Sequence, residues 1–136
     1  MDATRDCAVG VVEGGVVLIE SIKRAKTEIL RRAMSLIQAN NIHSYVLGRG
    51  YYFAECRFLQ DETKVGLKYI PTDRFYKSEG KRIRDYVCRS LRENGFRSVF
   101  VGLDEEIGGV FIIVDMKEIA EKMVPYLDQS FPAVTE

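Results

Sequence analysis

The stretch Gly109-Val110-Phe111-Ile112-Ile113-Val114 decides the fold that we expect for this chain of 136 residues. Its run of apolar residues faces both sides of an extended backbone, which is typical of a central strand. The segment Arg97–Leu103 precedes it across a polar turn and is predicted to be its hairpin partner. Three more strands are predicted upstream, at Ile42–Leu47, Tyr51–Leu59 and Lys64–Ile70. The sequence therefore indicates a mainly antiparallel, five-stranded sheet.

Helical spacing marks the segments that flank these strands. From about Ser21 to Ala39, apolar residues recur every three or four positions, and Asn40-Asn41 is the predicted stop. A second helix is predicted over residues 73–94, where Gly95 can take the left-handed conformation that closes a helix. A last helix begins near Asp115, with Glu118 in the capping-box position.

The expected order is helix, three strands, helix, two strands, helix, in a single α+β domain that spans residues 1–136. Residues 1–20 are expected to be irregular or a small hairpin, and residues 130–136 a frayed tail. A chain of this length can bury a core without a metal or a disulfide. We expect that core to contain Ile22, Ile29, Leu36, Ile83, Val87, Leu91, Val99, Val101, Phe111 and Ile113. Cys7, Cys56 and Cys88 are odd in number and far apart, which favours a reducing, cytoplasmic setting. The longest apolar run, Val110–Val114, is too short to span a membrane.

The formal net charge of zero conceals a split along the chain. Residues 1–102 hold 18 Lys/Arg and 12 Asp/Glu, a net of +6, whereas residues 103–136 hold 2 and 8, a net of −6. Such asymmetry indicates either a surface that binds polyanions or two parts of one fold that attract each other.

Much of the positive charge lies on the predicted helix 73–94. On a helical wheel, its apolar residues occupy one arc and its basic residues the opposite arc, with Asp85 the only acid among them. We predict that this basic face contacts nucleic acid through Arg74, Lys77, Lys81, Arg82, Arg84, Arg89 and Arg92. Further basic residues that we expect to contribute are Lys23, Arg24, Arg31, Arg57 and Lys68. The alternative is a solvated face that the acidic segment of the same or a neighbouring subunit neutralises.

The segment Arg49-Gly50-Tyr51-Tyr52-Phe53-Ala54-Glu55-Cys56 partly resembles the second ribonucleoprotein motif strand of RNA-recognition domains. The resemblance implies that Tyr51 and Phe53 stack on bases beside Arg57 and Lys68. The alternative is that these aromatic side chains pack under helices or at a subunit contact.

No catalytic signature accompanies the basic face. The order of elements resembles the core of restriction-endonuclease-like nucleases, which need an acid-x-Lys on the third strand, but Gly66-Leu67-Lys68 supplies only the lysine. His43 is the single histidine, and the cysteines show no CxxC spacing. We expect no metal and no cofactor, and the sequence leans away from an enzyme.

Three functions therefore stay open. The first is a non-enzymatic nucleic-acid-binding domain. The second is a protein-interaction module, since the order of elements also resembles small dimeric secretion-chaperone-like domains. The third is an enzyme whose site is assembled in an oligomer. Short strands with edges that need covering favour a homodimer.

Overall fold

The computed structural model of the protein describes residues 12–59 and 61–124. Along the chain its elements are α1 (Val12–Ala39), α2 (Ile42–Gly48), β1 (Tyr51–Leu59), β2 (Lys64–Pro71), the 3-10 helix η1 (Arg74–Glu79), α3 (Gly80–Glu93), β3 (Phe100–Asp104), β4 (Gly109–Asp115) and α4 (Met116–Lys122). The strands form one antiparallel sheet in the order β1-β2-β4-β3. The predicted α+β class and antiparallel sheet are confirmed.

Strand β4 lies inside the sheet, between β2 and β3, as its apolar sequence predicts. Its alternate residues Val110, Ile112 and Val114 are fully buried, whereas Phe111 and Ile113 face the other side and are half-buried. Only one face of the sheet therefore builds the core.

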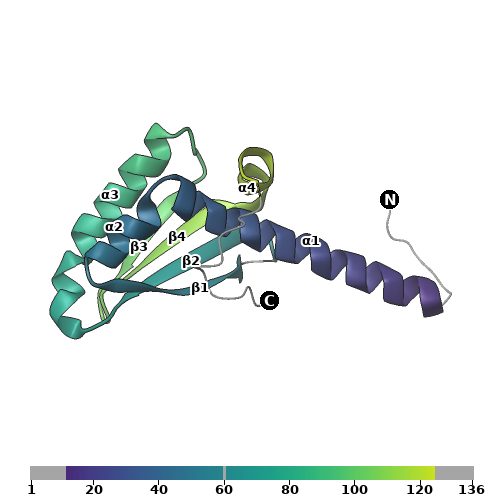
Figure 1. Cartoon of the computed structure of the whole chain (residues 1–136), viewed down its shortest axis with the longest axis horizontal. Coiled ribbons are helices and arrows are strands. Elements are labelled where there is room, and N and C mark those ends of the chain that lie inside the picture. Colours follow the sequence, from purple (N-terminus) through teal and green to yellow (C-terminus); the bar gives the residue numbers. More distant parts are fainter. Residues whose placement is uncertain (1–11, 60, 125–136) are drawn as a thin grey trace.

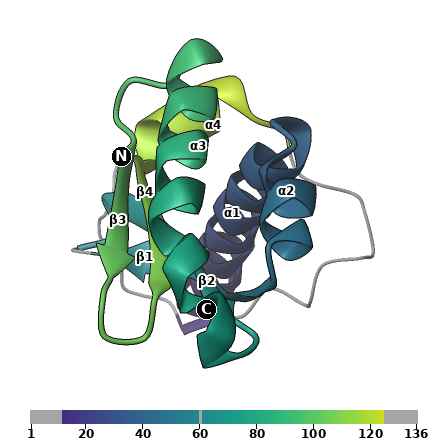
Figure 2. The same ribbon diagram turned by 90° about the vertical axis from the view of Figure 1, so that its left-hand side faces the viewer.

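Helices α1, α2 and α3 cover that core-building face, as the end-on view in Figure 2 shows. The second half of α1 supplies Leu30, Leu36 and Ile37 to the core, and α3 supplies Ile83 and Val87. The first half of α1 projects past the sheet (Figure 1). Helix α4 is fastened to α1, because the Arg32 guanidinium donates to the Ala120 and Met123 carbonyls at 3.0 and 2.8 Å.

The strand predicted at Ile42–Leu47 is wrong, because these residues form helix α2. Ile42 and Val46, about one helical turn apart, are both fully buried, whereas Ser44 between them is exposed, as it would not be on the same face of a strand. Asn41 takes the left-handed conformation, with φ of 59°, and separates α2 from α1. The observed order is consequently two helices, two strands, the η1–α3 helical segment, two strands and a helix, and the sheet has four strands.

The prediction for residues 1–20 is wrong from Val12 onward, because residues 12–20 belong to α1. Residues 1–11 and the expected tail 130–136 lie outside the described residues. The helix predicted over residues 73–94 is divided into η1 and α3. Its two ends are confirmed: the Asp73 carboxylate accepts from the Phe75 amide at 2.9 Å, and Gly95 has φ of +91°.

Within residues 12–59 and 61–124, no helix combines the length and the apolar character needed to cross a membrane.

Candidate nucleic-acid interface

Helices α2 and α3 lie side by side and bring Tyr45 onto Tyr86. The two rings stack with centroids 3.7 Å apart and planes 11° from parallel. The Arg49 guanidinium lies over the Tyr45 ring, 4.9 Å from its centroid. Because stacked aromatic and guanidinium planes hold one another in place, these side chains form an ordered wall on the outside of the helical layer.

A hollow of about 430 Å³ opens beside this stack. Besides Tyr45 and Tyr86, it is lined by Ser78, Lys81, Arg82, Asp85 and Arg89. Ser78 lies on η1, while Arg82, Asp85 and Arg89 are three or four positions apart and share one side of α3. The hollow thus combines basic groups, a hydroxyl and aromatic rings, which are the groups that contact phosphates and sugars in protein–nucleic-acid complexes.

The basic groups around the hollow are only partly neutralised. Arg82 and Arg49 approach the same Glu79 oxygen at 3.7 and 3.8 Å. Arg84 pairs with Asp85 at 3.1 Å, so Asp85 already has a cationic partner. In the described part of the chain, Lys81 and Arg89 make no ion pair, and both are exposed. The hollow consequently keeps a net positive charge.

The seven predicted basic residues do not form one continuous surface. Lys81, Arg82 and Arg89 line the hollow. Arg92 lies toward β3, where its guanidinium donates to the Cys88 sulfur at 3.3 Å and to the Val99 carbonyl at 3.4 Å. Arg84 shares this flank of α3 by helical spacing.

The remaining two residues of that set, Arg74 and Lys77, are exposed on η1. The aliphatic part of Lys77 packs against Gly108 in the β3–β4 turn. Only part of the predicted basic face therefore lines the hollow beside Tyr45.

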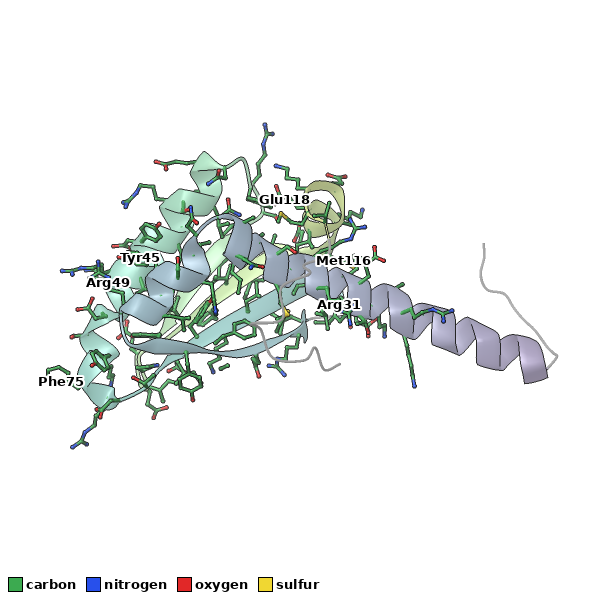
Figure 3. The ribbon with its side chains drawn as sticks, in the orientation of Figure 1. Arg31, Tyr45, Arg49, Phe75, Met116 and Glu118 are labelled. Atoms are coloured by element: carbon green, nitrogen blue, oxygen red, sulfur yellow. The ribbon has the colours of Figure 1, made fainter. Side chains whose placement is uncertain are left out.

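The additional basic residues lie on two other surfaces. Lys23, Arg24 and Arg31 border a separate hollow of about 420 Å³ on α1. Figure 3 shows Arg31 on α1, well away from Tyr45 and Arg49. Arg57 and Lys68 lie on the uncovered face of the sheet. None of these residues shares the hollow beside Tyr45.

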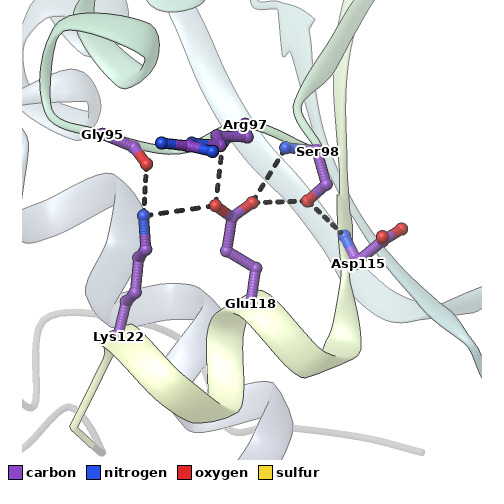
Figure 4. Close-up of polar contacts among 6 residues, drawn as sticks. All are labelled: Gly95, Arg97, Ser98, Asp115, Glu118 and Lys122. Atoms are coloured by element: carbon purple, nitrogen blue, oxygen red, sulfur yellow. Dashed lines mark hydrogen bonds and ion pairs between the residues drawn. The ribbon is translucent and has the colours of Figure 1, made fainter.

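The acidic segment that follows residue 102 does not neutralise α3. Glu118 binds the loop before β3: its carboxylate accepts from the Arg97 and Ser98 amides at 2.8 and 2.9 Å (Figure 4). Asp115 pairs with Lys64 at 2.5 Å, and Asp104 accepts from the Glu106 amide at 3.1 Å. These acids stabilise turns and strand ends, so among the described residues the acidic segment after residue 102 makes no ion pair with the basic face.

The aromatic strand faces mostly inward. Tyr51 is buried and its hydroxyl donates to the Gly108 carbonyl at 2.7 Å, while Phe53 packs edge-on against Tyr69 with centroids 5.6 Å apart. Burial, with a smaller effect of the Glu79 charge, raises the pKa of Tyr51. Base stacking on Tyr51 and Phe53, as the ribonucleoprotein resemblance implies, is therefore wrong, and the alternative of packing under helices is confirmed.

His43 and Cys56, whose side chains could carry acid–base or nucleophilic chemistry, are engaged in packing. His43 Nδ1 lies 2.8 Å from the hydroxyl of Tyr69, which is fully buried. Burial, helped by the Glu55 charge, raises the pKa of the Cys56 thiol to about 12, so it stays protonated at neutral pH. Among the residues that the structure describes, no three His, Cys, Asp or Glu side chains gather as metal ligands would.

The aromatic part of the hollow was not predicted. From the sequence, Tyr45 was predicted in a strand, Tyr86 on the apolar arc of the helix 73–94, and Arg49 in the segment that resembles the ribonucleoprotein strand. The spacing of Ile42, Tyr45 and Val46 is the signal that could have placed Tyr45 on a helix beside α3.

Comparisons of the chain with protein-family models, with curated proteins and with solved structures find no match. The proposals below therefore rest on the residues and their geometry.

Proposed function

We propose that the protein is a non-enzymatic nucleic-acid-binding domain that holds the phosphate backbone in the hollow between α2 and α3. The observation that carries the proposal is the convergence of Lys81, Arg82 and Arg89 beside the Tyr45–Tyr86 stack. When Lys and Arg side chains neutralise phosphates, counterions are released from the nucleic acid, and this release favours binding.

The geometry favours contacts to the backbone over contacts to base edges. The basic groups of the hollow come from one side of α3 and lie beside the Tyr45–Tyr86 stack, and cationic side chains most often contact phosphates and sugars. Phosphate contacts orient a strand without distinguishing its sequence. The domain is therefore proposed to bind with little sequence preference.

A charge-reversal triple variant tests the proposal. Lys81→Glu, Arg82→Glu and Arg89→Glu together should weaken binding of single- and double-stranded DNA and RNA at least tenfold at about 50 mM salt. The slope of log affinity against log salt should also fall by about 2 to 3. A mobility-shift titration over several salt concentrations measures both quantities.

The chain offers a matched control with the same change in net charge. Lys23→Glu, Arg24→Glu and Arg31→Glu remove the same number of cations from the α1 hollow. This control should retain most of the affinity. An equal loss in both triples would mean that overall charge, and not the hollow beside Tyr45, governs binding, and the proposal would then be wrong.

A further inference from the structure

The uncovered face of the sheet carries large apolar side chains. Phe100 is 57% exposed, and its ring packs against Phe111 with centroids 6.0 Å apart. Leu59 and Ile113 lie on the same face and are half-buried. Within residues 12–59 and 61–124 the helices all pack on the opposite face, so this apolar surface has no cover there. A contiguous exposed apolar surface of this kind marks an interaction site.

The uncovered face of the sheet has a hollow near its middle. Gly66, in β2, leaves no side chain at the middle of the face, and the Leu59 side chain leans over it. A hollow of about 200 Å³ lies there, lined in part by Leu59, Phe111 and Ile113. The register places Gly66 between Arg57 of β1 and Ile113 of β4, with Phe100 of β3 next in the row. One row of the sheet therefore presents a cation, a gap, an aliphatic side chain and an aromatic ring.

Charge on this face is divided between its two halves. Strands β1 and β2 contribute Arg57, Lys64 and Lys68, with Glu55 as the only acid. Strands β3 and β4 contribute only the acids Asp104 and Asp115. The charges sum to zero, so the face has little attraction for a polyanion. It is complementary to a surface whose positive and negative halves are reversed. A second copy related by a two-fold axis parallel to the strands presents such a surface.

We propose that this open sheet face binds the same face of a second copy of the chain. A two-fold axis parallel to the strands lays β1 and β2 of one copy over β3 and β4 of the other. Arg57 then lies opposite Phe100 of the second copy, and Ile113 of the second copy lies over Gly66. Lys64, which pairs with Asp115 of its own chain at 2.5 Å, also faces Asp115 of the second copy, so two such pairs meet with opposite charges opposed. Two sheets stacked in this way bury their apolar side chains in a layer about 10 Å thick.

Sedimentation of the full chain tests the association, because the dimer has twice the 15.5 kDa of one chain. Phe100→Glu places a charge in the contact and should shift the protein to monomer at the same concentration. The matched control is Phe75→Glu, since Phe75 is 80% exposed on η1, away from the sheet face. This control should stay dimeric. A wild type that remains monomeric up to about 100 µM overturns the proposal, because a specific interface between two sheet faces should be populated there.

A thiol cross-link with a spacer tests the orientation. Opposed residues of two stacked sheets lie about 10 Å apart, beyond the Cα–Cα reach of a disulfide, so the reagent is a bismaleimide whose two reactive ends span about 10 Å. Within one chain, Arg57 and Phe100 are separated by three strand spacings, about 14 Å. The double variant Arg57→Cys with Phe100→Cys should consequently form covalent dimers with this reagent, well above the level of wild type with its native cysteines. Each single variant should remain at the wild-type level. Equal cross-linking in a single variant, or loss of binding to a short oligonucleotide in a monomeric Phe100→Glu, would overturn this arrangement in favour of another occupant.

Discussion

Glu118 provides the sharpest test of how the C-terminal elements are joined. Its side chain is 11% exposed and accepts from the Arg97 and Ser98 amides, from the Ser98 hydroxyl at 2.5 Å and from Lys122 at 3.3 Å (Figure 4). Lys122 also donates to the Gly95 carbonyl. Through these contacts α4, which follows β4, holds the loop that leads into β3. We therefore expect Glu118→Gln to destabilise the fold.

The magnitude follows from the pKa of this carboxyl group. Burial alone would raise the pKa of Glu118, but the hydrogen bonds from Ser98, Arg97 and Lys122 outweigh burial and lower it from 4.5 to about 2. A difference of this size between the unfolded and folded states is worth about 3 kcal/mol at pH 7. A glutamine keeps the shape but turns an amide donor toward backbone donors, so Glu118→Gln should cost about 2 to 3 kcal/mol.

The sign of the pH dependence is also determined. The folded-state pKa is depressed, so the stabilisation is complete above the unfolded pKa of 4.5 and is lost as the pH falls toward 2. Wild type should consequently lose part of its advantage over Glu118→Gln on acidification. The gap in unfolding free energy should narrow by about 1 kcal/mol between pH 7 and pH 3.5.

Urea unfolding followed by circular dichroism at both pH values measures this gap. The control is Glu121→Gln, because Glu121 is exposed on the same helix and should change stability little. An unchanged urea midpoint for Glu118→Gln at pH 7 would refute the reasoning. A deficit of the same size at both pH values would show that the charge of Glu118 is not its source.

Other substitutions test the fold and the burial of individual groups. Ile112→Ala should cost about 2 to 5 kcal/mol in urea unfolding, because Ile112 is fully buried, whereas Phe111→Ala on the open face should cost less. Gly50→Ala should destabilise by more than about 1 kcal/mol, since Gly50 has φ of +87° and its added Cβ would lie 2.6 Å from the Tyr76 ring. Cys56, with its pKa raised to about 12, should resist alkylation at pH 8 until urea exposes it, and mass spectrometry of the modified chain checks this; rapid modification of the folded protein would contradict its burial.

The sheet was predictable where alternation and turn chemistry agreed. The hairpin of β3 and β4, the end of β2 at Pro71 and the closure of α3 at Gly95 all follow from local signals. The strand prediction for residues 42–47 was wrong because Ile42, Tyr45 and Val46 are residue types that favour strands. Only their spacing, and the burial they gain against the other helices, makes the segment helical.

The faces of β1 were predicted only in part because of a β-bulge. Regular alternation places Tyr51, Phe53, Glu55 and Arg57 on one face. The register shifts between Phe53 and Glu55, so Arg57 leaves the face of Tyr51 and joins the open face of the sheet. A bulge of this kind has no reliable sequence signal, and it separates Arg57 from the aromatic side chains that the sequence appeared to group with it.

The core was also assigned too broadly. Phe111 and Ile113 were predicted to be buried with the rest of their strand, and Ile22 with the first helix. The structure places Phe111 and Ile113 on the open face, while Ile22 is 46% exposed on the projecting part of α1. Apolar side chains that lie exposed together mark an interaction site, and on the open face this is the contact that we propose with a second copy.

The two proposed surfaces together make a further prediction about stoichiometry. The sheet separates the open face from α2 and α3. A dimer that forms through the open face therefore leaves the hollow beside Tyr45 of each protomer on its outside. A strand of about ten nucleotides is close to the usual site size for a small domain, so it should occupy the hollow of one protomer. Each protomer should bind one such strand, and Phe100→Glu should bind it with wild-type affinity.

A strand long enough to contact both hollows should behave differently. Its second contact is intramolecular in the dimer and is absent in the monomer, so Phe100→Glu should weaken binding of the long strand alone. Fluorescence anisotropy with labelled short and long strands of the same repeating sequence separates the two effects. An equal loss for both lengths would mean that Phe100 contacts the strand itself, because avidity acts only on a ligand that spans two sites.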